Sequence, residues 1–175
     1  TVLVKDIYPG AIGSNPSLFT NLNGIALFAA DNGSDGRELW KSNGTAAGTI
    51  LVQDIQAGSL GSNPTVLTKV GNLVLFGAND GVHGNEVWLS NGLGQGTRMM
   101  SEIQPGIDGS DPNVIFGYGP KVLVAATGPM VGNEIWIANV PADIPTAPEA
   151  IITASGPLAI CIGKTVQLQA NTGTG

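Results

Sequence analysis

Three glutamates recur in the chain with the same neighbours and the same spacing. Each lies two residues before a tryptophan in a short apolar segment, and successive copies are 48 residues apart: Glu38, Glu86 and Glu134 precede Trp40, Trp88 and Trp136. Residues two apart on a strand share a face, so each carboxylate is expected beside an indole ring. Burial beside an apolar ring raises the pKa of a carboxyl group, which is the setting of a general acid.

The regular recurrence argues against catalysis by these glutamates. Glycoside hydrolysis needs two carboxyl groups roughly 5–10 Å apart around one sugar, and equivalent residues on successive repeats are a poor way to build that pair. We expect a structural role, in which each carboxylate accepts backbone N–H groups from an adjacent glycine turn. For the tryptophans, packing between repeats is favoured over a carbohydrate-stacking platform, and their indole N–H groups then need buried acceptors.

The remaining polar residues predict turns, and no catalytic, cofactor-binding or metal-binding residue is assigned. His83 is the only histidine, so any Ser-His-Asp triad must use it, yet no nucleophile elbow lies near it. Residues 31–36, Asp-Asn-Gly-Ser-Asp-Gly, look faintly like a calcium loop, but Gly33 and Ser42 stand where an EF-hand needs Asp or Asn and Glu. We expect His83 to be a solvated loop residue, and the sequons at Asn32 and Asn43 to be turn chemistry.

The composition favours short strands joined by tight turns. The 175 residues include 26 Gly and 11 Pro, only 11% are charged, and no segment has helical periodicity. The net charge of −6 and the lack of a basic face argue against nucleic-acid binding. No apolar run approaches the roughly 18 residues that span a bilayer, and no signal peptide is recognisable. Because the chain opens inside a predicted strand, 1–7, we expect its natural N-terminus to lie upstream.

A repeat of 48 residues organises the chain up to Asn139. Besides the glutamates and tryptophans, further sets keep this register: Thr1, Thr49 and Thr97; Pro16, Pro64 and Pro112; Ser14, Ser62 and Ser110. Each unit predicts four strands, which in the second unit are 64–70, 73–79, 85–90 and 97–103. Asn and Gly between the strands supply the positive φ that tight turns require.

Four short antiparallel strands in roughly every 40–50 residues are typical of a β-propeller blade. The segments 73–78 and 121–126 are apolar on both faces, as expected for sheets covered on both sides. Because known rings use roughly 4–8 blades, we expect the three units to belong to a longer ring; an open β solenoid is the competing interpretation. The third unit ends before its fourth strand, so we expect an open arc with unpaired edges at both ends.

The segment 37–55, Arg-Glu-Leu-Trp-Lys-Ser-Asn-Gly-Thr-Ala-Ala-Gly-Thr-Ile-Leu-Val-Gln-Asp-Ile, resembles the repeat family named for its Glu-Leu-Trp-x-x-Asp-Gly-Thr motif (ELWxxDGT). The resemblance covers about residues 1–139 and continues through 58–64 and 73–84. The sequence departs from the motif where Asn43 and Asn91 replace its Asp and Leu93 replaces its Thr. Repeats of this family occur in large exported bacterial proteins, so the resemblance implies propeller-like repeats and an extracellular or cell-surface location.

The C-terminal residues 150–175 resemble, over 151–170, the opening of immunoglobulin-like modules of secreted proteins from the Bacteroidota. In such modules a cysteine at this place pairs with one on a later strand, which would explain why Cys161 is the single cysteine. Residues 140–149 carry three prolines and predict a semi-rigid spacer. The fold prediction is therefore all-β: three four-stranded antiparallel repeats as a partial β-propeller over 1–139, a linker over 140–149, and the first strands of an Ig-like β-sandwich over 150–175.

For function, these features favour a non-catalytic binding or adhesion scaffold, secreted or at the cell surface, that presents variable turns on regular repeats. The turns that vary are Ser-Asp at 34–35, Val-His at 82–83 and Met-Val at 130–131. The expected partners are a protein or carbohydrate ligand and the remaining blades of the same chain, with no cofactor, nucleic acid or membrane span. The alternative is a secreted glycan hydrolase or lyase whose active site lies on blades outside this chain. A third possibility is a purely structural spacer.

Overall fold

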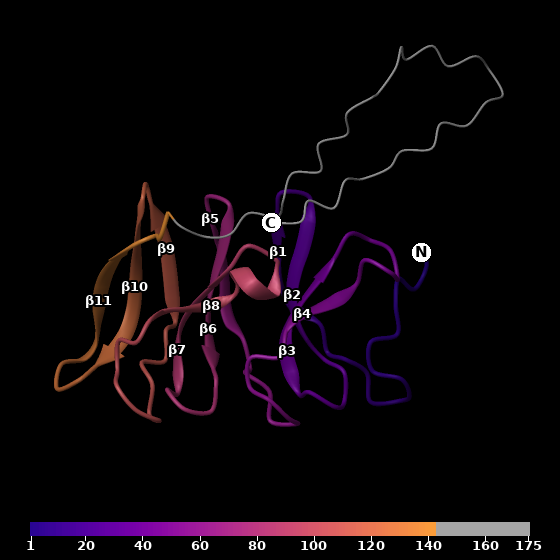
Figure 1. The fold of residues 1–175 in the computed structure, drawn as a ribbon, viewed down its shortest axis with the longest axis horizontal. Coiled ribbons are helices and arrows are strands. Elements are labelled where there is room, and N and C mark those ends of the chain that lie inside the picture. The colour runs from indigo at the N-terminus through magenta and orange to yellow at the C-terminus, as the bar shows by residue number, and fades with distance from the viewer. Residues whose placement is uncertain (143–175) are drawn as a thin grey trace, which may run out of the picture. The chain divides into compact units, whose positions relative to one another are not determined.

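The structure, a computed structural model, describes residues 1–142; the linker from residue 143, Cys161 and the predicted immunoglobulin-like strands lie outside the described residues. This part of the chain is antiparallel β-structure with a single 3₁₀ turn, η1 (Gly94–Gly96) (Figure 1). The strands are β1 (Ser17–Leu22), β2 (Ile25–Asp31), β3 (Arg37–Ser42), β4 (Ile50–Gln53), β5 (Thr65–Val70), β6 (Leu73–Asn79), β7 (Asn85–Ser90), β8 (Arg98–Ser101), β9 (Val114–Tyr118), β10 (Lys121–Gly128) and β11 (Gly132–Asn139). Over residues 1–142, no helix has the length and apolar character to cross a membrane.

The strands form three sheets in which every strand pairs with its neighbour in sequence. The first sheet has the order β1-β2-β3-β4, the second β5-β6-β7-β8 and the third β9-β10-β11. One register recurs every 48 residues, in the aligned pairs Phe28–Trp40, Phe76–Trp88 and Val124–Trp136. The prediction of an all-β chain is confirmed. The prediction of four strands per repeat is confirmed for the first two repeats; within residues 1–142 the third sheet has three strands, as expected for a unit that ends before its fourth strand.

The strands of the second sheet lie close to their predicted positions. β6 and β7 coincide with the predicted ranges 73–79 and 85–90, β5 begins one residue after Pro64, and β8 is shorter than the predicted 97–103. Between β1 and β2, Asn23 and Gly24 both have positive φ, 54° and 89°. This is the geometry of a two-residue type I′ turn, whose twist matches that of the flanking strands.

The strand expected over residues 1–7 is not formed. Residues 1–6 have no regular secondary structure, and Val2 and Leu3 are exposed. A strand needs backbone partners for its N–H and C=O groups, and this segment pairs with no strand of residues 1–142. It is held instead by Lys5, whose Nζ donates to the carbonyl oxygen of Thr49 at 2.7 Å.

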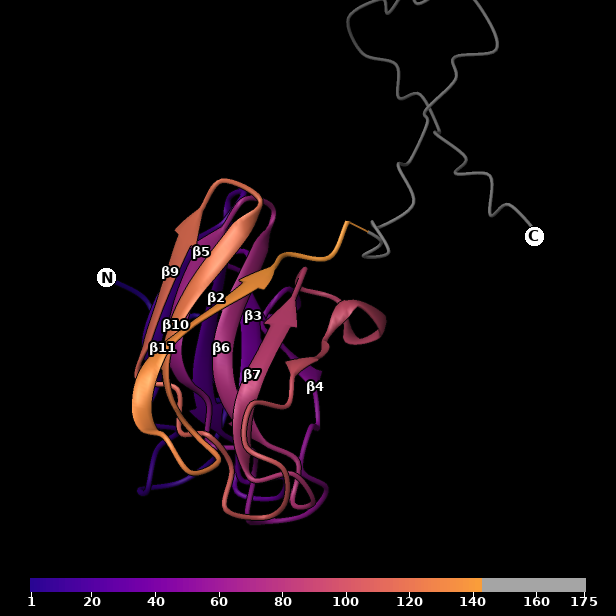
Figure 2. The same cartoon turned by 90° about the vertical axis from the view of Figure 1, so that its left-hand side faces the viewer.

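Each sheet has two faces, which we call front and back. In the first, second and third sheets the front face carries the aligned residues Phe28, Phe76 and Val124, and the back face carries Leu27, Leu75 and Leu123. The sheets lie face to face (Figures 1 and 2). The back of each sheet packs on the front of the next.

Two apolar cores result from this stacking. The first joins the first two sheets through Leu22, Leu27, Leu39, Ile55, Val74, Phe76, Ala78 and Trp88. The second joins the second and third sheets through Val70, Leu73, Leu75, Val87, Leu89, Ile115, Val122, Val124 and Ala126. Truncating a fully buried leucine in such a core to alanine costs about 2–5 kcal/mol, so these two interfaces hold the stack together.

The loops that link consecutive sheets run against the turns between the second and third strands. The N–H of Asn63 donates to the carbonyl of Arg37 at 3.0 Å. A Cβ on Gly36 would lie 2.6 Å from the backbone nitrogen of Gly61, and one on Gly84 would lie 2.4 Å from that of Gly109. Turn and loop therefore approach each other so closely that no side chain fits between them.

We expect Gly84→Ala to destabilise the chain far more than Gly71→Ala. Both glycines have positive φ, +69° and +60°, so both substitutions introduce backbone strain of about 1–2 kcal/mol. Only at residue 84 does the new Cβ meet a neighbouring backbone, whereas nothing lies within 4 Å of Gly71. Urea denaturation should show a loss about 2 kcal/mol larger for Gly84→Ala; equal losses would contradict the close approach.

Candidate functional site

The carboxylate of Glu38 lies inside a closed hydrogen-bond cluster. Its side chain is fully buried. It accepts the backbone N–H of Gln56 at 3.1 Å, the N–H of Ser62 at 2.7 Å and the Ser62 hydroxyl at 2.5 Å. Burial raises the pKa of Glu38, and the hydrogen bonds from Ser62 and Gln56 partly offset that effect. The cluster ties the loop between the first two sheets to β3 and leaves both carboxylate oxygens engaged.

Glu86 repeats the arrangement one sheet further on. It is fully buried and accepts the backbone N–H groups of Ile103 at 2.9 Å and Gln104 at 2.8 Å, and the hydroxyl of Ser110 at 2.6 Å. In both clusters the backbone N–H donors belong to the linking loop, and none of them is a glycine. The sequence had predicted donors from an adjacent glycine turn. Glu134, the third copy, is exposed, since no repeat loop follows β11 in residues 1–142.

The three tryptophans differ in their hydrogen bonds. Trp40 and Trp88 are buried and Trp136 is half-buried. Trp136 donates from Nε1 to the carbonyl of Ala126 at 2.9 Å. The Nε1 atoms of Trp40 and Trp88 are buried without a partner, so the expectation of a buried acceptor for each indole is wrong for these two. Because both rings are enclosed, neither presents a face on which a sugar can stack.

The loop between the third and fourth strands is closed by side-chain hydrogen bonds. In the first sheet, Ser42 Oγ and Thr49 Oγ1 lie 2.7 Å apart, and the N–H of Thr45 donates to Asn43 Oδ1 at 3.1 Å. A Cβ on Gly48 would lie 1.9 Å from the same Oδ1. The same hydroxyl pair recurs between β7 and β8. Asn43 therefore caps this turn, because its amide oxygen accepts the backbone N–H of Thr45.

One end of the sheets gathers the turns that differ between repeats, and we call it the loop face. It consists of the turns 32–36, 80–84 and 129–131 together with the linking loops 8–16, 54–64 and 102–113, at the bottom of Figure 1. The opposite end carries the turns between the first and second strands.

Polar side chains of the loop face stabilise their own turns. Asp31 Oδ1 accepts the N–H of Gly33 at 2.7 Å, and Asn32 Oδ1 accepts those of Ser34 and Asp35 at 2.9 Å. Asn32 also donates from Nδ2 to Asp35 Oδ2 at 2.7 Å. Within residues 1–142, no group of three or more His, Cys, Asp or Glu side chains is placed to hold a metal ion. The segment 31–36 is a turn whose oxygens face its own backbone.

The side chains of His83 and Asp80 meet across the corresponding turn of the second repeat and form an ion pair when His83 is protonated. His83 Nδ1 lies 2.7 Å from Asp80 Oδ2, and Asp80 Oδ1 accepts the N–H groups of Val82 at 2.9 Å and His83 at 2.8 Å. The hydrogen bond to Asp80 raises the pKa of His83 above its ordinary 6.5. Burial acts to raise the pKa of Asp80, but its hydrogen bonds from His83 and Val82 outweigh that effect and lower it. The pair holds the turn in shape at the surface.

Apolar side chains are exposed at the tips of the loop face: Ile12, Leu60, Val82, Ile107, Met130 and Val131. The variable turns named from the sequence include Val82, Met130 and Val131, but not Leu60 or Ile107. The sequence pattern that could have predicted the exposure of Leu60 and Ile107 is an apolar residue between Gly and either Ser or Asp, in a loop without apolar periodicity. Such residues have no core to enter, so they remain at the surface.

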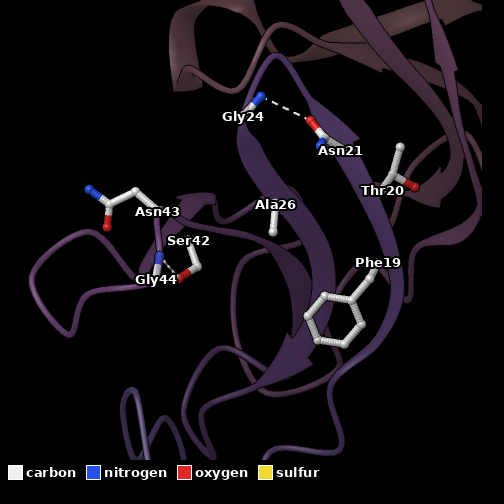
Figure 3. A pocket seen from close by; sticks show the side chains of 8 residues that line it. All are labelled: Phe19, Thr20, Asn21, Gly24, Ala26, Ser42, Asn43 and Gly44. Atoms are coloured by element: carbon white, nitrogen blue, oxygen red, sulfur yellow. Dashed lines mark hydrogen bonds between the residues drawn. The ribbon is translucent and has the colours of Figure 1, made fainter.

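A shallow hollow of about 380 Å³ opens on the front face of the first sheet, at the end away from the loop face (Figure 3). Its lining carries no charged side chain and consists of Phe19, Thr20, Asn21, Gly24, Ala26, Ser42, Asn43 and Gly44. The ring of Phe19 stacks on that of Phe28, with centroids 4.9 Å apart. The hollow has the chemistry of a packing surface and lacks acid–base groups.

Comparison with known proteins adds little to this description. No family model and no curated protein matches the chain. Two solved structures are similar: the crystal structure of the computationally designed Ika4 protein (16% identity, 77% of this chain and 71% of that chain, TM-score 0.41) and that of the computationally designed Ika8 protein (14% identity, 78% and 36%, TM-score 0.41). At this level of similarity nothing is inferred from the two designed proteins about this chain. Its fold is defined by the strand pairing described above.

We expect Glu38→Ala to lower the free energy of unfolding by about 2–4 kcal/mol, because it leaves the buried donors of Gln56 and Ser62 without an acceptor. Glu102→Ala removes an exposed glutamate and should change stability by no more than about 0.5 kcal/mol. Thermal and urea denaturation of both variants test the difference. A Glu38→Ala variant as stable as Glu102→Ala would show that the cluster contributes nothing.

The single histidine allows a direct titration of its turn. We expect the NMR midpoint of His83 to lie above 6.5 and to fall toward that value in Asp80→Asn, with a smaller fall in Glu102→Gln. Because the pKa is raised on folding, the pair contributes stability below pH 6.5 that is lost as pH rises through the raised value. A midpoint unchanged by Asp80→Asn would contradict the ion pair.

Proposed function

We propose that this chain is a non-catalytic binding or adhesion scaffold of an exported protein, and that its three sheets are consecutive blades of a β-propeller. In this proposal the loop face is the binding surface and the ligand is a protein or a carbohydrate. The resemblance of residues 1–139 to the ELWxxDGT repeats, and of 150–175 to immunoglobulin-like modules, supports an extracellular or cell-surface location.

The approach of the first strands supports the propeller arrangement. β1 lies against β5 and β5 against β9, and the hydroxyl of Thr20 in β1 donates to the carbonyl of Leu67 in β5 at 3.0 Å. Blades that radiate from a common axis come closest at one strand of each sheet. The same packing step, back face on front face, leads from the first sheet to the second and from the second to the third.

The separation of constant and variable residues carries the proposal. The polar residues that recur in register are buried in the first two sheets: Glu38, Glu86, Thr49, Thr97, Ser62 and Ser110. The residues that differ between repeats, such as Val82 and Met130, are exposed at the turns. A scaffold that buries these recurring polar residues leaves its exposed turns free to differ, and loops on rigid frameworks commonly carry recognition.

The chemistry of the loop face indicates the kind of ligand. Its exposed apolar side chains, such as Val82 and Met130, are available to contact an apolar surface of a ligand. The net charge of −6 disfavours a polyanionic partner. A neutral glycan or a protein with an apolar patch fits best. The inward orientation of Glu38 and Glu86, with their oxygens bound to backbone donors, supports a non-catalytic role for these two residues.

A glycan and protein array probed with the full chain tests the proposal. We expect a ligand whose affinity falls at least tenfold, about 1.4 kcal/mol, in the double variant Val82→Asp/Met130→Asp. Ala46→Asp places the same charge on an exposed residue of the loop that follows β3, away from the loop face, and should leave binding intact. Loss of binding in Ala46→Asp alone, or no ligand on either array, would contradict the loop face as the binding surface.

A further inference from the structure

Three segments pack side by side in the middle of the loop face, at the bottom of Figure 1. The turn 80–84 has a linking loop on each side. A Cβ on Gly81 would meet a side chain of the loop 54–64 at 3.3 Å, and one on Gly84 would meet the backbone of the loop 102–113 at 2.4 Å. The second sheet, to which this turn belongs, has a described sheet on each side. The three segments are therefore not at an end of the stack.

Each of these segments exposes one aliphatic side chain. Leu60 is 75% exposed, Val82 65% and Ile107 74%. Because their segments are packed together, the three side chains belong to one stretch of surface, and the turn of the third sheet adds Met130 and Val131 to the same loop face. Covering exposed aliphatic groups is favourable, so a partner of this surface gains by bringing an apolar patch of its own.

The loop face is also acidic. Its six segments contain no Lys or Arg, and they contain six carboxylates: Asp35, Asp54, Asp80, Glu102, Asp108 and Asp111. All of these except Asp35 and Asp80 are exposed. Arg37 follows the turn 32–36, and its guanidinium donates to the carbonyl of Asn15 and to the hydroxyl of Ser17. Charges of one sign on one surface sum to a field that attracts the opposite sign.

The other basic residues of the described chain lie toward the opposite end of the sheets: Lys5, Lys41, Lys69, Arg98 and Lys121. Lys69 Nζ donates at 3.1 Å to Asn23 Oδ1, in the turn between β1 and β2. Lys41 Nζ donates at 2.7 Å to the carbonyl of Gly92, in the loop after β7. The turns and loops of that end contain no Asp or Glu: 23–24, 43–49, 71–72, 91–97 and 119–120. The described chain is therefore polarised, with its negative charge gathered on the loop face.

The loop face has no exposed aromatic ring on which a sugar could stack. Tyr8 is the single aromatic residue of its six segments. It is half-buried, and its ring lies against the turn 32–36, where a Cβ on Gly33 would be 2.7 Å from Tyr8 Cζ. Aliphatic groups among carboxylates match a protein surface better than a glycan, because protein interfaces combine an apolar centre with a polar rim.

We propose that the partner of the loop face is a basic protein surface on which lysine or arginine side chains surround an apolar patch. The apolar patch covers Leu60, Val82 and Ile107, and the cations face the exposed carboxylates around them. Complementary charge speeds the encounter and selects the partner, while the apolar contact holds it. This inference rests on the proposed function, since it names the class of partner for the same surface.

Fluorescence anisotropy with synthetic peptides tests this chemistry on the full chain. The probe is a labelled peptide of alternating leucine and lysine. Glutamate replaces lysine in one matched peptide, and serine replaces leucine in the other. We expect the leucine–lysine peptide to bind about tenfold more tightly than either matched peptide, and its affinity to fall with added salt, which screens exposed charges. No binding, equal binding of the three peptides or a preference for the glutamate peptide would overturn the proposal.

Paired variants locate the binding on the loop face. Glu102→Gln/Asp108→Asn removes two exposed negative charges and should weaken the leucine–lysine peptide about tenfold. Ala46→Lys/Ala47→Lys changes the net charge by the same amount on exposed residues at the opposite end and should leave the affinity unchanged. Val82→Ser/Ile107→Ser keeps every charge and should weaken binding through the lost apolar contact. An equal loss in the two charge variants would show a non-specific charge effect and overturn the proposal.

The same variants, tested with a ligand from the glycan and protein array, separate this inference from the proposed function. A basic protein that loses affinity in both Glu102→Gln/Asp108→Asn and Val82→Ser/Ile107→Ser supports both. A ligand that loses affinity only in Val82→Ser/Ile107→Ser, such as a neutral glycan, overturns the basic partner and leaves the loop face as a binding surface. If no array ligand requires the loop face, the proposed function fails, and this inference fails with it.

Discussion

A short antiparallel sheet with two apolar faces is stable only when both faces are covered, and the rest of this structure depends on that constraint. Leu75 and Phe76 are adjacent in β6 and point to opposite faces, yet both are fully buried, because one packs toward the third sheet and the other toward the first. A single repeat cannot bury both side chains. The unit of stability is therefore the interface between repeats and not the repeat itself.

The buried glutamates hold in place, by hydrogen bonds, the loops that link one stacked sheet to the next. A loop that links one sheet to the next has backbone N–H groups without partners in a sheet. A buried N–H group without an acceptor is unfavourable. Glu38 and Glu86 each collect two such groups and a serine hydroxyl. Burial of the carboxylate is itself unfavourable, and the three donors offset that cost. In these two clusters the serine hydroxyl donates to the glutamate carboxylate, so each residue satisfies the other.

The apolar periodicity and the turn residues were enough to predict the strands inside each repeat. They did not predict which segments find a partner or how the sheets pack on one another. β6 and β7 follow directly from apolar runs bounded by Gly and Asn, which is local information. The strand expected over residues 1–7 is absent, because its formation requires a neighbouring edge that the apolar pattern cannot supply. The unpaired indole N–H groups of Trp40 and Trp88, the exposed Leu60 and Ile107, and the hollow beside Phe19 all depend on how sheets meet in space, which no single repeat specifies.

The interlocking of each linking loop with the turn beside it, where Gly36 meets Gly61 and Gly84 meets Gly109, also bears on how the chain reaches this structure. Every contact of this kind joins segments no more than one repeat apart, so the search for native contacts stays short-ranged. Folding can begin in either sheet pair and propagate to its neighbour. A gene duplication that adds one whole period of 48 residues would extend the stack without disturbing an existing contact, whereas an insertion of a few residues within a period would break the register of both neighbours.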